Sequence, residues 1–244
     1  MEIFDKAKKL TTVLLSVLLI STLFTLNGAT TTVKAATTNP VQFYSSYQNH
    51  YYIGTYFTTY IKVNTLGSNQ HVYIHAKTDT TTWGDIEGQY VTTLNDGSQI
   101  WEVSTSFIGS NIEYAIKYVV DGQTYWDNNN SSNYTEANIL GSGVNIAVNQ
   151  AFSGSITASV YPIKVAVSNF SYDKTVIVRY TQDNWVTYTD KTLSYSNINS
   201  DGSEYWATTV DLNPNTTSNF HYAVGYVDNG VTYWDNNFGS NYNF

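Results

Sequence analysis

Alternating hydrophobic and polar residues dominate the chain after its first 35 residues. Val176, Val178 and Tyr180 alternate with other residue types, and segments 206–212 and 220–226 continue the same alternation. A period of two places every second side chain on one face of an extended strand. After residue 35 no segment shows a sustained helical period. The pattern therefore predicts β-strands throughout this region.

Short turn sequences separate the predicted strands. Asp121-Gly122 and Asp228-Asn229-Gly230 each lie between two alternating segments. Asp, Asn and Gly tolerate the positive φ angles that tight β-hairpins require. Neighbouring strands are therefore expected to be antiparallel, and short strands at this spacing favour an immunoglobulin-like β-sandwich.

The strand pattern occurs twice along the chain. Residues 114–134 recur as residues 222–242, and both copies contain Tyr-Trp-Asp-Asn-Asn and end in Asn-Tyr. Each copy extends over about 100 residues, which is far longer than a solenoid repeat. We therefore expect an all-β protein of two tandem immunoglobulin-like antiparallel β-sandwich modules. Their expected limits are residues 39–135 and 143–244, joined by a linker at 136–142.

The N-terminus has the pattern of an export signal. A basic start containing Lys6, Lys8 and Lys9 precedes an apolar run at residues 10–26, and Val33-Lys34-Ala35 follows. Small residues at these positions are typical of a signal-peptidase site. The alternative is an uncleaved membrane anchor, although 17 residues interrupted by Ser and Thr are short for a membrane span. We expect residues 1–35 to be a signal peptide and the protein to be secreted. Association of the secreted protein with the cell surface is an alternative location.

Charge and composition restrict the class of ligand. Removing the four Lys and two acidic residues of positions 1–35 from totals of 11 and 19 leaves 7 basic and 17 acidic residues. A net charge of about −10 argues against nucleic acid and anionic membrane surfaces as partners. Cysteine is absent, which excludes thiol catalysis and thiolate metal sites. Abundant Tyr, Asn, Thr and Ser suit a neutral polyhydroxylated ligand, although β-strand preference alone also enriches Tyr and Thr.

The six tryptophans differ in their surroundings. Trp101 and Trp206 alternate with apolar residues, so we expect them in the core. Trp83 and Trp185 follow polar runs, which places them at a loop or strand edge. An exposed Trp there is costly unless a ligand uses it. We interpret these two residues as flat platforms for a sugar ring.

The last two tryptophans directly follow a tyrosine. Trp126 comes after Tyr125, and Trp234 comes after Tyr233. Consecutive strand residues point to opposite faces, so one aromatic of each pair faces outward. We expect the Trp to be outward, with the following Asp-Asn-Asn run close enough to bond sugar hydroxyls.

The duplicated Tyr-Trp-Asp-Asn-Asn motif, its terminal Asn-Tyr and the upstream Trp resemble family 21 of the carbohydrate-binding modules. These are starch- and glycogen-binding domains found on fungal glucoamylase and on glycogen-targeting subunits of a protein phosphatase. The resemblance covers nearly all of the chain after residue 35, twice, and implies an eight-stranded sandwich with two sugar sites per module. The residues that match its first sugar site are Trp83, Trp126, Asn128 and Asn133, and in the second module Trp185, Trp234, Asn236 and Asn241.

This sequence departs from the family in two respects. A tyrosine of the first site is replaced by Ala115 and Ala223, which implies a smaller platform. The second site is matched only in the second module, by Tyr172 with Lys174 and Tyr195 nearby. The first module has Ser68 and Gln70 at the corresponding positions and keeps only Tyr90.

A non-catalytic polysaccharide-binding protein for starch, glycogen and maltooligosaccharides is the predicted function. We identify no catalytic residue, metal site or cofactor, because the repeated Asp127 and Asp235 have no acidic partner and the four His lack metal-ligand spacing.

Secreted amylolytic enzymes are the expected protein partners. The alternative is a surface adhesin or structural β-sandwich protein whose sugar sites have decayed. A phosphatase-targeting subunit is disfavoured by the export signal.

Cleavage of the expected signal peptide would give a defined N-terminus. We expect the protein recovered from the medium of a secreting host to begin at Ala36, because Ala35 completes the small-residue pattern. Intact-mass measurement and N-terminal sequencing check this. A membrane-bound product that retains residues 1–35 would instead support the uncleaved anchor.

Overall fold

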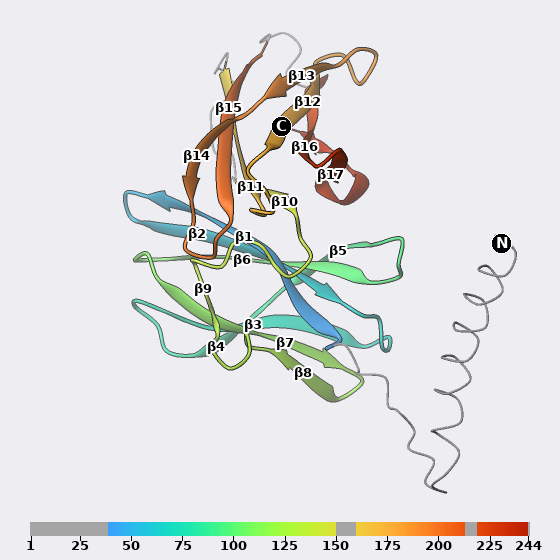
Figure 1. The fold of residues 1–244 in the computed structure, drawn as a ribbon. Coiled ribbons are helices and arrows are strands. Elements are labelled where there is room, and N and C mark those ends of the chain that lie inside the picture. The colour runs from blue at the N-terminus through green and yellow to red at the C-terminus, as the bar shows by residue number, and fades with distance from the viewer. Residues whose placement is uncertain (1–38, 150–159, 213–218, 244) are drawn as a thin grey trace, which may run out of the picture. The chain divides into compact units, whose positions relative to one another are not determined.

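The computed structural model describes residues 39–149, 160–212 and 219–243. The expected signal peptide, residues 1–35, lies outside them. Four antiparallel sheets form two sandwich-like units (Figure 1), which confirms the predicted all-β fold. The first unit contains strands β1–β9 and the second contains β10–β18.

In the first sandwich, one sheet has the order β1-β2-β6-β5 and the other the order β4-β3-β7-β8, with β9 also paired to β7. Their bounds are β1 Val41–Tyr51, β2 Gly54–Val63, β3 Gln70–Thr78, β4 Gly84–Glu87, β5 Gln89–Thr93, β6 Gln99–Phe107, β7 Ile112–Val120, β8 Gln123–Asp127 and β9 Tyr134–Thr135.

The second sandwich repeats this topology, with sheets β10-β11-β15-β14 and β13-β12-β16-β17 and with β18 paired to β16. Its elements are β10 Ile146–Val148, β11 Val160–Val167, β12 Lys174–Thr181, β13 Thr189–Thr192, β14 Ser194–Ile198, β15 Glu204–Asp211, β16 His221–Asp228, β17 Val231–Asp235, the short 3-10 turn Asn237–Gly239 and β18 Tyr242–Asn243.

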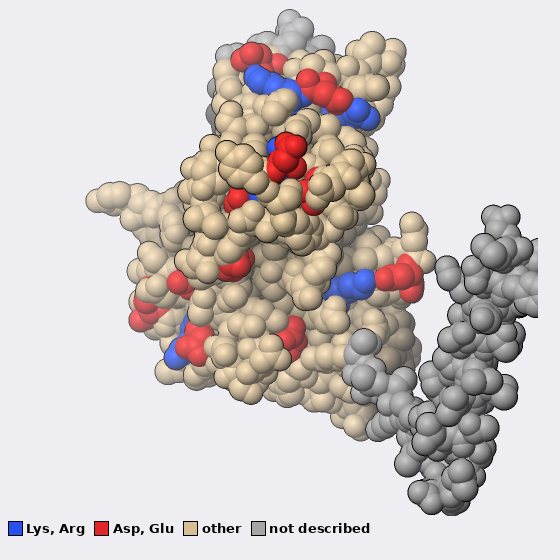
Figure 2. All heavy atoms as spheres, in the orientation of Figure 1, with Lys and Arg blue, Asp and Glu red and all other residues tan. Residues whose placement is uncertain are grey.

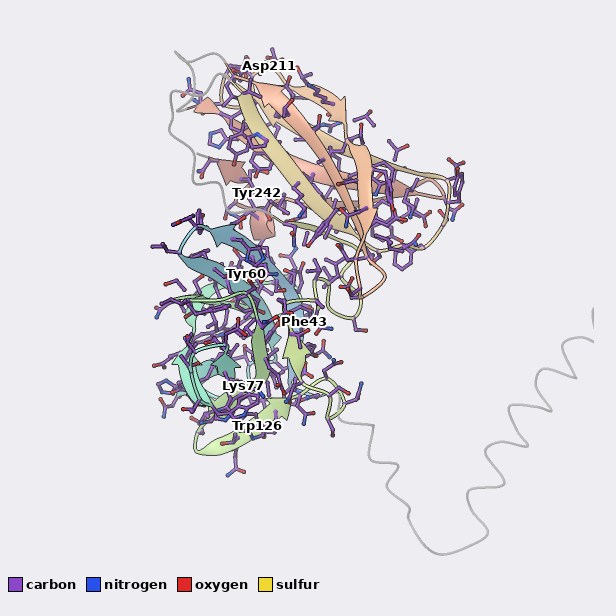
Figure 3. The ribbon with its side chains drawn as sticks, turned by 90° about the vertical axis from the view of Figure 1, so that its left-hand side faces the viewer. Phe43, Tyr60, Lys77, Trp126, Asp211 and Tyr242 are labelled. Carbon is purple, nitrogen blue, oxygen red and sulfur yellow. The ribbon has the colours of Figure 1, made fainter. Side chains whose placement is uncertain are left out.

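Each sandwich encloses its own apolar core. In β3 the side chains of Val72, Ile74 and Ala76 are buried, and β12 buries Val176 and Val178 in the same way. Residues between them point to the outer face of the sheet, because strand side chains alternate. The outer faces of β3 and β12 are therefore free to carry polar residues. Phe43, labelled in Figure 3, belongs to the core of the first sandwich.

The two predicted hairpins are present. Asp121 and Gly122 connect β7 to β8, and Asn229 and Gly230 connect β16 to β17, all with positive φ. Two such residues in succession match the two-residue turn that suits the strand twist. Each turn leads into the short strand that carries the Tyr-Trp pair.

Residues 136–142, the expected linker, pack along β1. The Ser46 amide donates to the Ile139 carbonyl at 3.0 Å, and the Gly141 amide donates to the Tyr44 carbonyl at 2.7 Å. A Cβ atom at Gly141 would lie 2.1 Å from the Phe43 carbonyl oxygen. Only glycine allows this close backbone approach.

Charges are sparse on the described surface. On the face shown in Figure 2, broad areas belong to uncharged residues, and acidic and basic side chains occur in small groups. Within the described part of the chain, no helix has the length and hydropathy needed to cross a bilayer.

Buried tyrosines predict a loss of stability at alkaline pH. Burial raises the pKa of Tyr114 in β7, of its counterpart Tyr222 in β16, and of Tyr205, whose pKa reaches about 12. Tyrosines of the unfolded chain ionise near pH 10. The unfolded state therefore loses protons first, and the free energy of unfolding falls as pH rises from about 10 towards 12.

Urea denaturation at a series of pH values, followed together with tyrosinate absorbance, checks this expectation. Tyr114→Phe keeps the ring and removes one titrating group, so its stability should fall less steeply with pH. An unchanged pH dependence in that variant would contradict the assignment.

Candidate functional site

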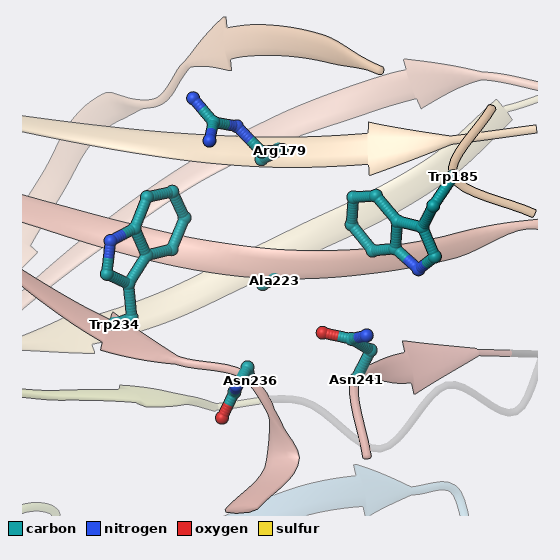
Figure 4. Close-up of a pocket in the computed structure, with 6 residues that line it drawn as sticks. All are labelled: Arg179, Trp185, Ala223, Trp234, Asn236 and Asn241. Atoms are coloured by element: carbon teal, nitrogen blue, oxygen red, sulfur yellow. The ribbon is translucent and has the colours of Figure 1, made fainter. Parts of the chain in front are cut away.

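A pocket of about 320 Å³ lies on the outer face of the sheet formed by β13, β12, β16 and β17. Figure 4 shows the indoles of Trp185 and Trp234 at its two ends, with Ala223 on the floor between them. Asn236 and Asn241 form one wall and Arg179 lines the other. Four of these six residues, the two Trp and the two Asn, are those that the sequence assigned to a first sugar site.

Trp185 is held in an unusual backbone conformation. It follows Asn184, and both have left-handed φ angles, 66° and 56°. This region is costly for a bulky residue and is often found at functional sites. Thr181 Oγ1 accepts from the Trp185 amide at 3.0 Å, and the Asp183 carboxylate accepts from the Thr181 hydroxyl and the Thr187 amide. These bonds hold the pKa of Asp183 at about 2, with the Thr181 hydroxyl as the largest cause.

Trp234 reaches the pocket from β17. Its neighbour Tyr233 packs against the core, so Trp234 points outward as predicted. Gly225 is its partner across the strands, and a Cβ atom there would lie 3.1 Å from the Trp234 ring. The missing side chain lets the indole lie directly over the β16 backbone. All four platform tryptophans are 37 to 45% exposed.

Arg179 is fixed by Asp190 on the neighbouring strand. Its Nε and Nη2 donate to the two carboxylate oxygens, both at 2.7 Å. The bond lowers the pKa of Asp190 and raises that of Arg179. The guanidinium lies 4.3 Å from the Tyr188 ring centroid and 5.2 Å from that of Trp234. Arg179 is therefore fixed at one side of the pocket, with its charge paired to that of Asp190.

The Asn-rich wall is fastened by Asp235. Its carboxylate accepts from the Val148 amide at 2.7 Å, the Asn237 amide at 3.1 Å and the Tyr242 hydroxyl at 2.8 Å. Burial raises the pKa of Asp235, and these hydrogen bonds act in the opposite direction. The repeated Asp of the motif is therefore a structural anchor that ties the loop to β18 and β10.

The asparagines of this wall contribute an unusual backbone conformation as well as their side-chain amides. Asn237 and Asn241 have φ angles of 52° and 58°. Asn populates the left-handed region more readily than most residues. Asn236 Oδ1 accepts from the Gly239 amide at 2.9 Å, and the Asn241 amide group lines the pocket.

The first sandwich has its four predicted residues at the equivalent positions of the repeat, and each of them contacts other residues of that sandwich. His75 stacks on Trp83 and also contacts Trp126, which Figure 3 labels on β8. Asn128 Oδ1 accepts from the Ser131 amide, and Asn133 Nδ2 donates to Glu113 at 2.7 Å.

The residues of the predicted second site have different surroundings. Tyr172 is fully exposed in the loop before β12, and Tyr195 on β14 lies 6.0 Å from the Trp206 ring. The Lys174 side chain is only 3% exposed, and its ammonium donates to Asn169 and to Glu204. Trp206 Nε1 also donates to Glu204. The Lys174 ammonium is thus engaged within the sandwich, and a direct sugar contact from it stays a prediction.

The two expected core tryptophans are half-buried. Trp101 and Trp206 pack against the core clusters of their sandwiches, and their Nε1 atoms donate to Gln99 and Glu204. Their indoles therefore lie at the core edge.

Sequence reasoning missed the charged residues of the site, namely Arg179, Asp190 and, in the first sandwich, His75, Asp85 and Lys117. A signal was present, because His75 and Arg179 occupy the same position of the repeat between two apolar neighbours. A basic residue at the same position of both copies, between two apolar residues, indicates an outward position on the sheet beside the outward Trp.

Comparison with known proteins finds matches to the second sandwich. Residues 145–244 match the family model of the carbohydrate/starch-binding module, family 21. Human protein phosphatase 1 regulatory subunit 3B is 38% identical over 82 residues, which cover 32% of this chain and 29% of that protein. Glycogen-binding subunit 76A of Drosophila melanogaster is 32% identical over 99 residues, covering 40% of this chain and 13% of that protein. The chain thus matches under a third of the length of these relatives.

A solved structure of the starch-binding domain of Rhizopus oryzae glucoamylase, in complex with β-cyclodextrin and maltoheptaose, was also found. It is 28% identical, covers 40% of this chain and 92% of that domain, and has a TM-score of 0.35.

Removing the Asp235 carboxylate should destabilise the second sandwich. Asp235→Ala leaves the Val148 and Asn237 amides and the Tyr242 hydroxyl without their acceptor, at a cost of about 3 kcal/mol. Tyr242→Phe removes one of these donors and should cost about 1 kcal/mol. Urea denaturation measures both. Asp211→Ala, at an exposed position of β15 labelled in Figure 3, is the matched control and should change stability by under about 0.5 kcal/mol. Equal effects of the two Asp substitutions would refute the anchoring role.

Proposed function

We propose that this protein is a secreted, non-catalytic binder of starch- and glycogen-type α-glucans. The observation that carries the proposal is the pocket between Trp185 and Trp234, within the residues that match the starch-binding family. The export signal and the absence of catalysis are parts of the proposal that rest on the sequence.

The pocket suits a curved chain of glucose units. A glucose ring exposes axial C–H groups, and an indole face complements them by apolar contact. The two indoles stand at opposite ends of the floor formed by Ala223, so a curved α-1,4 chain can touch both. Asn241 and Asn236 on one wall, together with the free Nη1 side of Arg179, offer neutral and charged donors for hydroxyl groups.

The site is open and its contacts are few. Stacking of one ring contributes about 1 kcal/mol beyond burial, and each hydroxyl bond competes with water. Binding also costs entropy of the ligand. We therefore expect a dissociation constant of about 0.1–1 mM for one site. In this range, a second linked module raises the affinity of the protein for a polymer.

We include the first sandwich as a second, weaker copy of the module. The duplicated motif and the common topology support this, although the family model covers the second copy alone. Tyr172 and Tyr195 form the proposed second surface of the second sandwich, and secreted amylolytic enzymes are the proposed partners. The phosphatase relatives share only the matched segment, so their regulatory role is not carried over.

Loss of the two indoles should abolish binding at the pocket. Trp185→Ala together with Trp234→Ala should weaken binding of the full chain to maltoheptaose at least tenfold, about 1.4 kcal/mol, because both stacking surfaces are removed. Isothermal calorimetry measures the affinity, and depletion onto granular starch and glycogen tests the polymers.

A control variant removes an exposed aromatic ring that lies outside the pocket. Tyr52→Ala removes a fully exposed aromatic ring from the β1–β2 turn of the first sandwich and should leave binding unchanged. Cellulose serves as the β-linked comparison and should not deplete the protein. Wild-type binding to cellulose but not to starch, or no binding to any glucan, would overturn the proposal and favour a structural sandwich whose sugar sites have decayed.

A further inference from the structure

The two sandwiches differ in what lies between their outward indoles. In the second, the space between Trp185 and Trp234 is the pocket described above. In the first, the His75 ring fills this space. It stacks on Trp83 at a centroid distance of 5.2 Å and an interplanar angle of 10°, and it meets Trp126 edge-on at 5.9 Å.

Hydrogen bonds fix His75 in this position. Its Nδ1 lies 2.7 Å from Asp85 Oδ1 on β4, and Lys117 on β7 donates to the other oxygen of Asp85 at 2.6 Å. The bond from Lys117 is the largest cause that lowers the pKa of Asp85, which keeps this acceptor ionised. The Nδ1 atom of His75 is therefore bonded to a charged acceptor while the His75 ring stacks on the indole of Trp83.

The remaining groups of this site are also occupied. The Lys77 ammonium lies 5.2 Å from the Trp83 ring centroid and pairs with Glu113 at 2.7 Å. Glu113 also accepts the bond from Asn133. The amide that lines the pocket in the second sandwich, Asn241, thus has a counterpart that is already engaged.

The residues across the strands also differ between the two copies. Lys117 is the partner of Trp126, and Gly225 is the partner of Trp234. Gly225 lets the indole lie against the sheet, whereas Lys117 places an ammonium 5.9 Å from the centroid of Trp126. Arg179, at the position of His75, is drawn to Asp190 and lies at the pocket wall.

We propose that His75 is a built-in competitor of the glucan at the first sandwich. A glucose ring needs the space between Trp83 and Trp126, so it binds there only when His75 leaves its stacked position. His75 thereby makes the two copies unequal: the second sandwich captures the glucan, and the first binds only weakly. This inference rests on the proposed glucan-binding function.

The test uses the full chain with the second pocket disabled. In the background Trp185→Ala with Trp234→Ala, the added change His75→Ala should strengthen maltoheptaose binding about tenfold, because displacement of a stacked and hydrogen-bonded ring is no longer required. Asp85→Asn keeps the ring but weakens its charged acceptor, and it should give a smaller gain. Asp85→Asn also tests the inference if His75→Ala fails to fold.

His71→Ala is the matched control. His71 lies on the same strand and face, pairs with Glu87 at 2.7 Å and stacks on Tyr73 instead of Trp83, so this change should leave affinity unaltered. Unchanged or weaker binding in both His75→Ala and Asp85→Asn would overturn the inference, and weaker binding would make His75 itself a sugar contact. If the unmodified chain binds no glucan, the proposed function fails. If it binds through the second pocket while neither variant gains, only the competitor role fails.

Discussion

The carboxylate that follows the outward Trp holds each candidate site together. Asp127 accepts from the Phe43 amide and the Tyr134 hydroxyl, as Asp235 accepts from the Val148 amide and the Tyr242 hydroxyl. One side chain thereby joins the first strand of a sandwich, the loop after the Trp and the last strand. The loop that forms the pocket wall has little regular structure of its own. Its shape depends on this acceptor, since unsatisfied partly buried amides would be costly.

Much of the fold could be predicted from the sequence because it depends on local rules. The period-two pattern gives the strands, and the Asp-Gly and Asn-Gly pairs give the hairpins at their observed positions. Strand alternation required one aromatic of each Tyr-Trp pair to face outward, and the choice of Trp rested on the polar Asp-Asn-Asn run that follows it. The path of residues 136–142 along β1 could not be predicted, because it depends on a backbone approach at Gly141 that leaves no pattern in the sequence.

The site was predictable only in part. The repeated motif identified the aromatic and Asn positions of the site. From the sequence, the only role predicted for these Asn residues was hydrogen bonding to a sugar. The structure gives several of them a second reason, since Asn129, Asn133, Asn237 and Asn241 all have left-handed backbones. For the first sugar site of each module, the shared motif suggested similar sites, whereas the second sugar site was matched in the second module alone. The structural difference between these two sites involves cross-strand neighbours such as Lys117 and Gly225, and pairing register cannot be read from a motif.

The left-handed backbone at Trp185 also has a kinetic consequence. Because Thr181 and Asp183 already fix this loop in the free protein, little ordering has to occur when a ligand arrives. Encounters then convert to complexes without a slow conformational step, and a weak site with fast arrival also has a short residence time. Under the proposed function, such a site would release one stretch of an insoluble polymer and engage the next, so the protein would explore a surface by repeated brief contacts.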